Sequence, residues 1–175
     1  IGLQGSFAPW VGEMIPDLET PILLITEVGK EEEAITRLSR VGCDNTQGYL
    51  ADGMKSWEAA GKDVDTINRI TAEELEQKMN QDIVIIDVRK KSEFDSEHIE
   101  GVVNVPLNQI NQHLEKFPKE QEFVLHCAGG YRSMIAASIL KQRGWSQLTD
   151  VIGGFKSIKE TTIPVTAYVC PSTLL

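Results

Sequence analysis

Apolar runs and amphipathic segments alternate along most of the second half of the chain. The nearly unbroken apolar run at residues 83–88 predicts a parallel strand covered on both faces. Three further strands are predicted at residues 102–105, 123–126 and 148–152. Helical spacing of apolar residues is found over 107–117 and 135–140, and a capping box at Thr71–Glu74 predicts a further short helix. Gly144 has the position of a helix-ending glycine. This alternation predicts a doubly wound parallel α/β sheet with ligands outside the carboxyl ends of its strands.

The first sixty residues repeat part of the same pattern. A shift of 102 positions places residues 22–24 on 124–126 and Gly42 on Gly144. Glycines that match at helix ends are informative because they mark positions that need positive φ. We therefore predict three parts: a truncated repeat that holds only the second half of a domain (1–62), a complete domain (63–160) and a C-terminal tail (161–175).

The clearest chemical signal lies in residues 124–133, which read VLHCAGGYRS. Cys127 follows a buried strand and precedes a helix, so its sulfur should face loop N–H groups and the positive end of the helix dipole. Such a nest favours thiolate over thiol. Gly129 and Gly130 allow the backbone to fold tightly around the sulfur, and Arg132 offers a fork of donors to an oxyanion.

Three other interpretations of this loop stay open at this stage. Cys127 could be a buried structural cysteine that ends a strand. A cysteine-based phosphatase or arsenate reductase of related fold also uses a Cys-to-Arg loop, although tetrahedral phosphate needs a loop one residue longer and a nearby acid. The domain could also be a non-catalytic binding module.

The block 63–160 resembles a rhodanese (sulfurtransferase) domain. The resemblance rests on the six-residue loop Cys127–Arg132 and on further motifs along the block: Asp87-Val88-Arg89 with Glu93-Phe94, His98-Ile99-Glu100-Gly101, Asn104-Val105-Pro106-Leu107 and Gly153-Gly154-Phe155. Three positions depart from the family pattern: Glu97 for glycine, Val102 for alanine and Phe155 for tryptophan.

The resemblance implies sulfur transfer without cofactor or metal. Cys127 would take sulfane sulfur from thiosulfate or a low-molecular-weight persulfide, and cyanide, sulfite or a thiol would remove it. The resulting persulfide would be held by the backbone amides of the rest of the loop: Ala128, Gly129, Gly130, Tyr131 and Arg132. Arg132 would orient the oxyanion, and Tyr131 would border the entrance.

The resemblance also suggests a role for the first repeat. Ile25, give or take one residue, and Lys30 stand where Cys127 and Arg132 stand in the second repeat, so the first repeat should be inactive. Two segments, 5–12 and 168–171, resemble the rhodanese part of metallo-β-lactamase–rhodanese fusions. A metallo-β-lactamase-like domain is therefore expected before Ile1.

Composition narrows the functional classes further. The 175 residues carry a net charge of −9, which argues against general nucleic-acid binding and requires any anion site to be local. No apolar run approaches the ~18 residues of a membrane span. The three separated cysteines suggest reduced thiols in the cytoplasm, with Cys170 as a candidate second thiol for sulfur relay. We also expect a local salt bridge between Arg89 and Glu93.

Overall fold

The computed structural model describes residues 1–170, which divide into two compact units at residues 66 and 67. The first unit contains α1 (Phe7–Met14), β1 (Ile22–Leu24), α2 (Glu31–Ser39), β2 (Thr46–Tyr49) and α3 (Met54–Ala59). The second unit contains β3 (Asn68–Ile70), α4 (Ala72–Lys78), β4 (Val84–Asp87), α5 (Lys91–Ser96), β5 (Val103–Asn104), the 3₁₀ helices η1 (Leu107–Gln112) and η2 (Leu114–Lys116), β6 (Phe123–His126), α6 (Tyr131–Gln142), β7 (Leu148–Val151) and α7 (Gly154–Ile158).

The second unit is built on a five-stranded sheet in the order β3-β7-β6-β4-β5. All four strand pairs are parallel, and the central pair runs in register from Val84 opposite Phe123 to Asp87 opposite His126. The predicted parallel α/β architecture is therefore confirmed. Because the central strands end together, the residues that follow β4 and β6 meet at one edge of the sheet.

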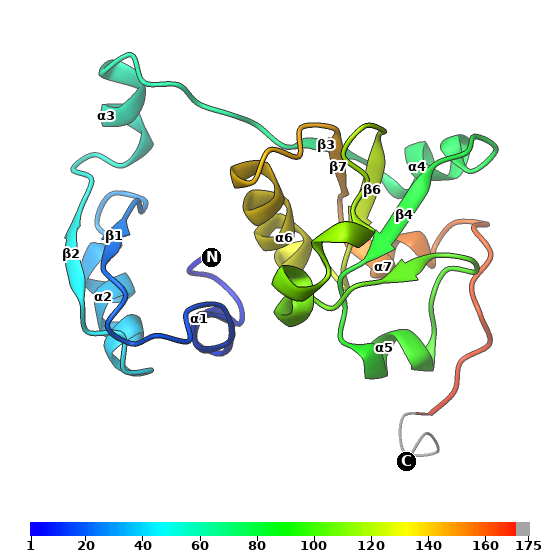
Figure 1. The fold of residues 1–175 in the computed structure, drawn as a ribbon, viewed down its shortest axis with the longest axis horizontal. Coiled ribbons are helices and arrows are strands. Elements are labelled where there is room, and N and C mark those ends of the chain that lie inside the picture. Colours follow the sequence, from blue (N-terminus) through cyan, green and yellow to red (C-terminus); the bar gives the residue numbers. More distant parts are fainter. Residues whose placement is uncertain (171–175) are drawn as a thin grey trace. The chain divides into compact units, whose positions relative to one another are not determined.

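Helices cover both faces of this sheet (Figure 1). Alternate strand residues point to opposite faces, so Ile85 and Val124 join the core beneath α4 and α7. Their neighbours Ile86 and Leu125, each 0% exposed, face the other side, where α6 and η1 contact each other. The central strands β4 and β6 are thus buried on both faces, whereas Val103 in the edge strand β5 is 42% exposed.

One predicted element is wrong. Residues 107–117 do not form one amphipathic α-helix but two short 3₁₀ helices, η1 and η2, separated at His113. The apolar residues are spaced by three, four and three positions, which also fits two three-residue turns with one extra residue between them. The spacing of the apolar residues alone therefore does not distinguish one α-helix from two 3₁₀ helices.

The described part of the tail packs on the second unit. Ile163 is 4% exposed, Val165 forms an antiparallel bridge with Ile99, and the Val169 N–H donates to the Ser96 carbonyl at 2.8 Å. Residues 171–175 of the predicted tail lie outside the described residues. Over residues 1–170, no helix combines the length and apolar composition needed to cross a membrane.

The first unit is a smaller α/β arrangement. Strands β1 and β2 pair in parallel, with an irregularity between Ile22 and Leu23. Its core is small and centres on Phe7, Val11, Leu38 and Cys43. Several large apolar side chains of this unit are exposed, among them Leu23 at 77%.

The central strand β6 should contribute most to the stability of the second unit. We expect Leu125→Ala to lower the free energy of unfolding by about 2–5 kcal/mol, because it leaves a cavity in a fully buried layer. Native-state hydrogen exchange of the β6 amides measures this loss. The matched change Ile152→Ala, at a side chain that is 44% exposed just after β7, should cost about 0.5 kcal/mol or less. Equal losses would contradict the assigned packing.

Candidate active site

The cysteine loop, residues 127–132, connects β6 to α6. All four residues of β6 are buried, so the strand delivers Cys127 to the edge of the sheet from a rigid core. The chain then turns at Gly130, whose φ of 98° is left-handed, and α6 begins at Tyr131. A glycine is needed at this turn because L side chains rarely adopt that conformation.

Hydrogen-bond donors surround the Cys127 sulfur. The Gly130 N–H donates to Sγ at 3.2 Å, and the Ser133 hydroxyl lies 3.5 Å from Sγ. The positive end of the twelve-residue helix α6 adds a favourable field for negative charge on the sulfur. Cys127 is only 1% exposed, so these donors act in a setting from which water is largely excluded.

The remaining predicted loop residues differ in exposure. Gly129 is exposed, Ala128, Tyr131 and Arg132 are partly buried, and Gly130 is buried. Gly129 and Ala128 therefore form the outer part of the loop. The assignment of these residues to substrate binding stays a prediction.

The Gly153-Gly154 turn fixes the loop from the side of α7. The Phe155 N–H donates to the Cys127 carbonyl at 2.7 Å, and the Lys156 N–H donates to the Ala128 carbonyl at 3.1 Å. Gly154 has a φ of 58°, and a Cβ there would approach the Cys127 carbonyl oxygen closer than 3.0 Å. The predicted glycine pair therefore allows α7 to dock directly on the backbone of the cysteine.

Arg132 is engaged by a carboxylate. Both terminal nitrogens of its guanidinium bind Glu93, with Nη2 to Oε1 at 2.9 Å and Nη1 to Oε2. The two side chains are 13% and 36% exposed, respectively. This bidentate pair joins α5 to α6, so the fork that was expected to hold a substrate oxyanion is occupied by Glu93.

The predicted salt bridge between Arg89 and Glu93 is wrong. Arg89 instead binds Asp87, from Nε to Oδ2 at 2.8 Å, and donates from Nη2 to the Glu97 carbonyl at 2.8 Å. Its guanidinium also lies 3.9 Å from the centre of the Phe155 ring. Because the strand end buries Arg89 and Asp87 together, they neutralise each other, and Glu93 is left for Arg132.

Burial and pairing act on the pKa of Glu93 in opposite directions. Burial alone would raise the pKa, but the hydrogen bonds and charge of Arg132 outweigh it and hold the pKa of Glu93 below its usual range. For Arg132 the pKa is raised, since Glu93 outweighs the opposing effect of burial. His126, which is 0% exposed, has its pKa lowered mainly by burial.

A third arginine–carboxylate pair was not predicted from the sequence. Arg69 on β3 donates from Nε to Oδ2 of Asp150 on β7 at 3.1 Å. Asp150 is fully buried, and burial raises its pKa against the lowering effects of Ser133 and Arg69. The signal available in the sequence was a charged residue inside an apolar strand, two positions before the end of the predicted run at Ile152.

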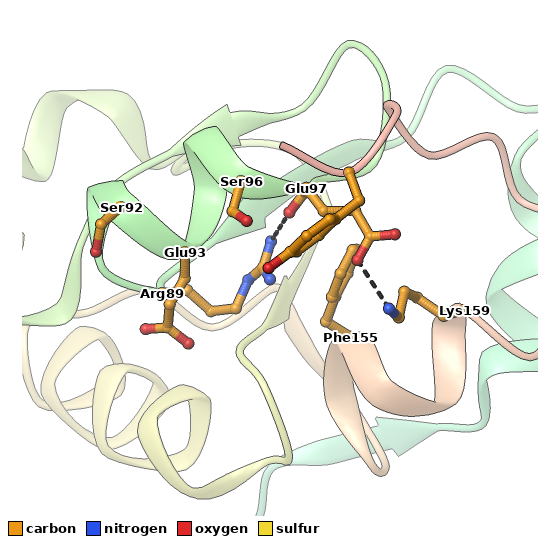
Figure 2. Close-up of a pocket in the computed structure, with 8 residues that line it drawn as sticks. Arg89, Ser92, Glu93, Ser96, Glu97, Phe155 and Lys159 are labelled. Atoms are coloured by element: carbon orange, nitrogen blue, oxygen red, sulfur yellow. Dashed lines mark hydrogen bonds and ion pairs between the residues drawn. The ribbon is translucent and has the colours of Figure 1, made fainter. Parts of the chain in front are cut away.

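A pocket of about 250 Å³ is lined in part by Glu93, the partner of Arg132 (Figure 2). It is lined by Arg89, Ser92, Glu93, Ser96, Glu97, Phe155, Lys159 and Tyr168. Figure 2 shows Lys159 reaching Glu97, an ion pair of 2.8 Å, while the Arg89 guanidinium lies deeper beside Phe155. The charges of this pocket are therefore largely paired.

The other two thiols lie outside the cysteine loop. Cys43 is buried in the core of the first unit, and Cys170 is exposed in the tail. Neither forms a disulfide bond. The relay role considered for Cys170 stays a prediction.

Comparisons with known proteins agree on the second unit. Residues 71–161 match a family described as Rhodanese-like domain. The chain is 32% identical over 93 residues to "Thiosulfate sulfurtransferase GlpE" of Coxiella burnetii, which covers 53% of this chain and 85% of that protein. The chain is 30% identical over 104 residues to "Putative sulfur carrier protein YrkF" of Bacillus subtilis (strain 168). That match spans 58% of this chain but only 56% of YrkF.

Solved structures show the same fold. A rhodanese-related protein from Thermoplasma volcanium superposes with a TM-score of 0.52 at 27% identity, covering 57% of this chain and 97% of that protein. A rhodanese-like domain protein from Staphylococcus aureus also gives a TM-score of 0.52, at 26% identity, with 58% and 100% coverage.

The close approach of Gly154 to the cysteine loop can be tested by adding one methyl group. We expect Gly154→Ala to destabilise the second unit by about 2 kcal/mol or more, because the new Cβ clashes with backbone at a left-handed position. In the control Gly129→Ala the added Cβ has no atom within 4 Å, so this change should lower the free energy of unfolding by about 0.5 kcal/mol or less. Hydrogen exchange of the β6 amides compares the two variants, and similar stabilities would refute the docking of α7 on the loop.

The lowered pKa of Glu93 predicts a pH dependence of stability. Its contribution is present above the unfolded pKa of about 4.3 and is lost as the pH falls toward the lower folded pKa. At neutral pH, Glu93→Gln should cost about 1 kcal/mol, a figure reduced for partial solvent exposure, and the cost should shrink in acid.

The free energy of unfolding, measured for both proteins across this pH range, provides the test. Glu122→Gln is the control, because its ion pair with Lys78 is exposed. A difference between wild type and Glu93→Gln that stays constant down to strongly acidic pH would show that the charge of Glu93 is not used.

Proposed function

Because the chain belongs to the family of rhodanese-like domains, we propose that its second unit is a sulfurtransferase that carries sulfane sulfur as a persulfide on Cys127. The single observation that carries this proposal is the set of donors around Sγ at the junction of β6 and α6. The names of relatives add support, since they include "Thiosulfate sulfurtransferase GlpE" and "Putative sulfur carrier protein YrkF".

The reaction has two steps. The Cys127 thiolate attacks the outer sulfur of thiosulfate, a new S–S bond forms, and the original S–S bond breaks so that sulfite leaves with the electron pair. A low-molecular-weight persulfide would react in the same way, with a thiolate leaving. Cyanide, sulfite or a thiol then attacks the outer sulfur of the persulfide, takes it, and regenerates the Cys127 thiolate.

The loop suits an anion that is one sulfur atom larger than the thiolate. The Gly130 N–H and the Ser133 hydroxyl can donate to negative charge without reorganising, because both are held at the start of α6. Since Cys127 is 1% exposed, a donor reaches Sγ only after a local movement. We assign this movement to the exposed tip of the loop at Gly129.

The charge pairing argues against a phosphatase or arsenate reductase. Such chemistry needs a carboxyl group that protonates the leaving oxygen. The three carboxylates described around the loop are each engaged by an arginine: Asp87 by Arg89, Glu93 by Arg132 and Asp150 by Arg69. The six-residue loop is also the shorter of the two kinds.

We further propose that the first unit is an inactive, truncated repeat of the second. Its order β1-α2-β2-α3 is the order β6-α6-β7-α7, and β1 and β2 are parallel like β6 and β7. A Cβ on Gly53 would press on the Thr26 carbonyl, just as one on Gly154 would press on that of Cys127. This match supports Thr26, which has no thiol, at the cysteine position. A metallo-β-lactamase-like neighbour stays a prediction.

The central prediction concerns mass. Incubation with thiosulfate should add about 32 Da, one sulfur atom, and Cys127→Ser should abolish the gain. Intact-protein mass spectrometry measures it. The matched controls Cys43→Ser and Cys170→Ser keep the cysteine loop and should still gain the sulfur.

Further outcomes separate the alternatives. Release of thiocyanate after addition of cyanide supports a transferase, whereas a stable persulfide without thiocyanate supports a carrier. An unmodified wild-type mass would favour a binding module, and hydrolysis of p-nitrophenyl phosphate without persulfide would favour a phosphatase.

A further inference from the structure

The proposed donor poses an electrostatic problem. Thiosulfate is a dianion that must approach a thiolate, and the whole chain has a net charge of −9. The amide and hydroxyl donors around Sγ serve the sulfur itself and do not reach the far end of the donor. A local cation must therefore hold the sulfonate oxygens and the sulfite that leaves.

Two cations near the loop are poorly placed for this task. Arg132 has both terminal nitrogens on Glu93. Arg89 is 4% exposed and is bound to Asp87. Recruiting either guanidinium would break a partly or fully buried ion pair and leave a carboxylate unpaired, which is costly.

Arg69 has the placement that the other arginines lack. It lies in β3, beside β7, and its side chain is 43% exposed. The Nη2 atom lies 3.8 Å from the position that a Cβ on Gly130 would occupy, so the guanidinium reaches the turn of the cysteine loop. Gly130 is also the residue whose N–H donates to the Cys127 sulfur.

Asp150 holds Arg69 in this position without using its terminal donors. The hydrogen bond runs from Nε to Oδ2 at 3.1 Å, and Nε is only one of the nitrogens of the guanidinium. Asp150 itself is 0% exposed and rigidly placed in β7. Asp150 thus holds the Arg69 guanidinium through Nε, while Nη1 and Nη2 take no part in this hydrogen bond.

We propose that Arg69 binds the negatively charged end of the sulfur donor and thereby selects anionic sulfane donors. This inference rests on the proposed sulfur transfer and adds the residue that sets its donor class. Thiosulfate would place its sulfonate oxygens on the Arg69 terminal nitrogens and its outer sulfur toward Cys127. The sulfite that leaves carries its two negative charges toward the same guanidinium.

The test separates charge recognition from the reactivity of the thiol. In a Cys43→Ser/Cys170→Ser background, the rate of Cys127 sulfuration by thiosulfate is measured together with two alkylation rates. Iodoacetate and iodoacetamide both alkylate the thiolate and differ in one negative charge. Access to Cys127 and its thiolate content affect both rates, so they cancel in the ratio of the two rates. The ratio therefore reports on recognition of the negative charge. Peptide mass spectrometry assigns both reactions to Cys127.

The expected result is a selective loss. Arg69→Gln should lower the sulfuration rate and the iodoacetate-to-iodoacetamide ratio by roughly 10- to 100-fold, as for one charge-assisted hydrogen bond. Arg69→Lys should recover part of both. The control Arg143→Gln removes an exposed cation at the C-terminal end of α6, the end opposite the cysteine loop, and should change the ratio by less than about threefold.

Removing Arg69 also leaves Asp150 without its ion pair, so a double variant is needed. If Arg69 recognises the donor, the double variant Arg69→Gln/Asp150→Asn keeps the lowered sulfuration rate and the lowered alkylation ratio. If the double variant recovers both the sulfuration rate and the ratio, Arg69 serves only to pair Asp150, and the inference is overturned. An unchanged ratio in Arg69→Gln, or an equal loss in Arg143→Gln, overturns it as well. Absence of any sulfuration in the wild type would instead defeat the proposed function, while the alkylation ratio would still decide the role of Arg69.

Discussion

The sulfur of Cys127 is held by protein hydrogen-bond donors instead of water, and the surrounding architecture maintains this arrangement. Strand β6 fixes the cysteine, and the turn at Gly130 aims its N–H at Sγ. Helix α7 secures the loop by binding the Cys127 and Ala128 carbonyls. Because each of these contacts uses backbone, the cradle is preorganised and needs little rearrangement when charge develops on the sulfur.

The three arginines near this cradle differ in their carboxylate partners and in their exposure. Arg132 joins α5 to α6 through Glu93, and Arg89 stabilises the end of β4 through Asp87. Both guanidiniums are therefore engaged by carboxylates in the present arrangement. Arg69 alone of the three combines an anchored base with substantial exposure at the loop. In a chain with a net charge of −9, Arg69 thus brings guanidinium nitrogens to the turn of the cysteine loop.

Much of this was predictable from sequence because it depends on local patterns. The buried strands, the cysteine loop and the glycines at 144 and 154 follow from neighbouring residues. The ion pairs did not follow, since Arg69 and Asp150 are 81 positions apart and Glu93 and Arg132 are 39 apart. Only the strand order brings these partners together. The two 3₁₀ helices were missed because their spacing also fits an α-helix.

The most direct measurement of the central claim is a crystal structure of the protein exposed to thiosulfate. The account predicts one additional sulfur atom about 2.05 Å from the Cys127 Sγ, within reach of the donors at the start of α6. Sulfur bound instead to Cys170, or a bare Cys127 beside an intact thiosulfate ion, would contradict it.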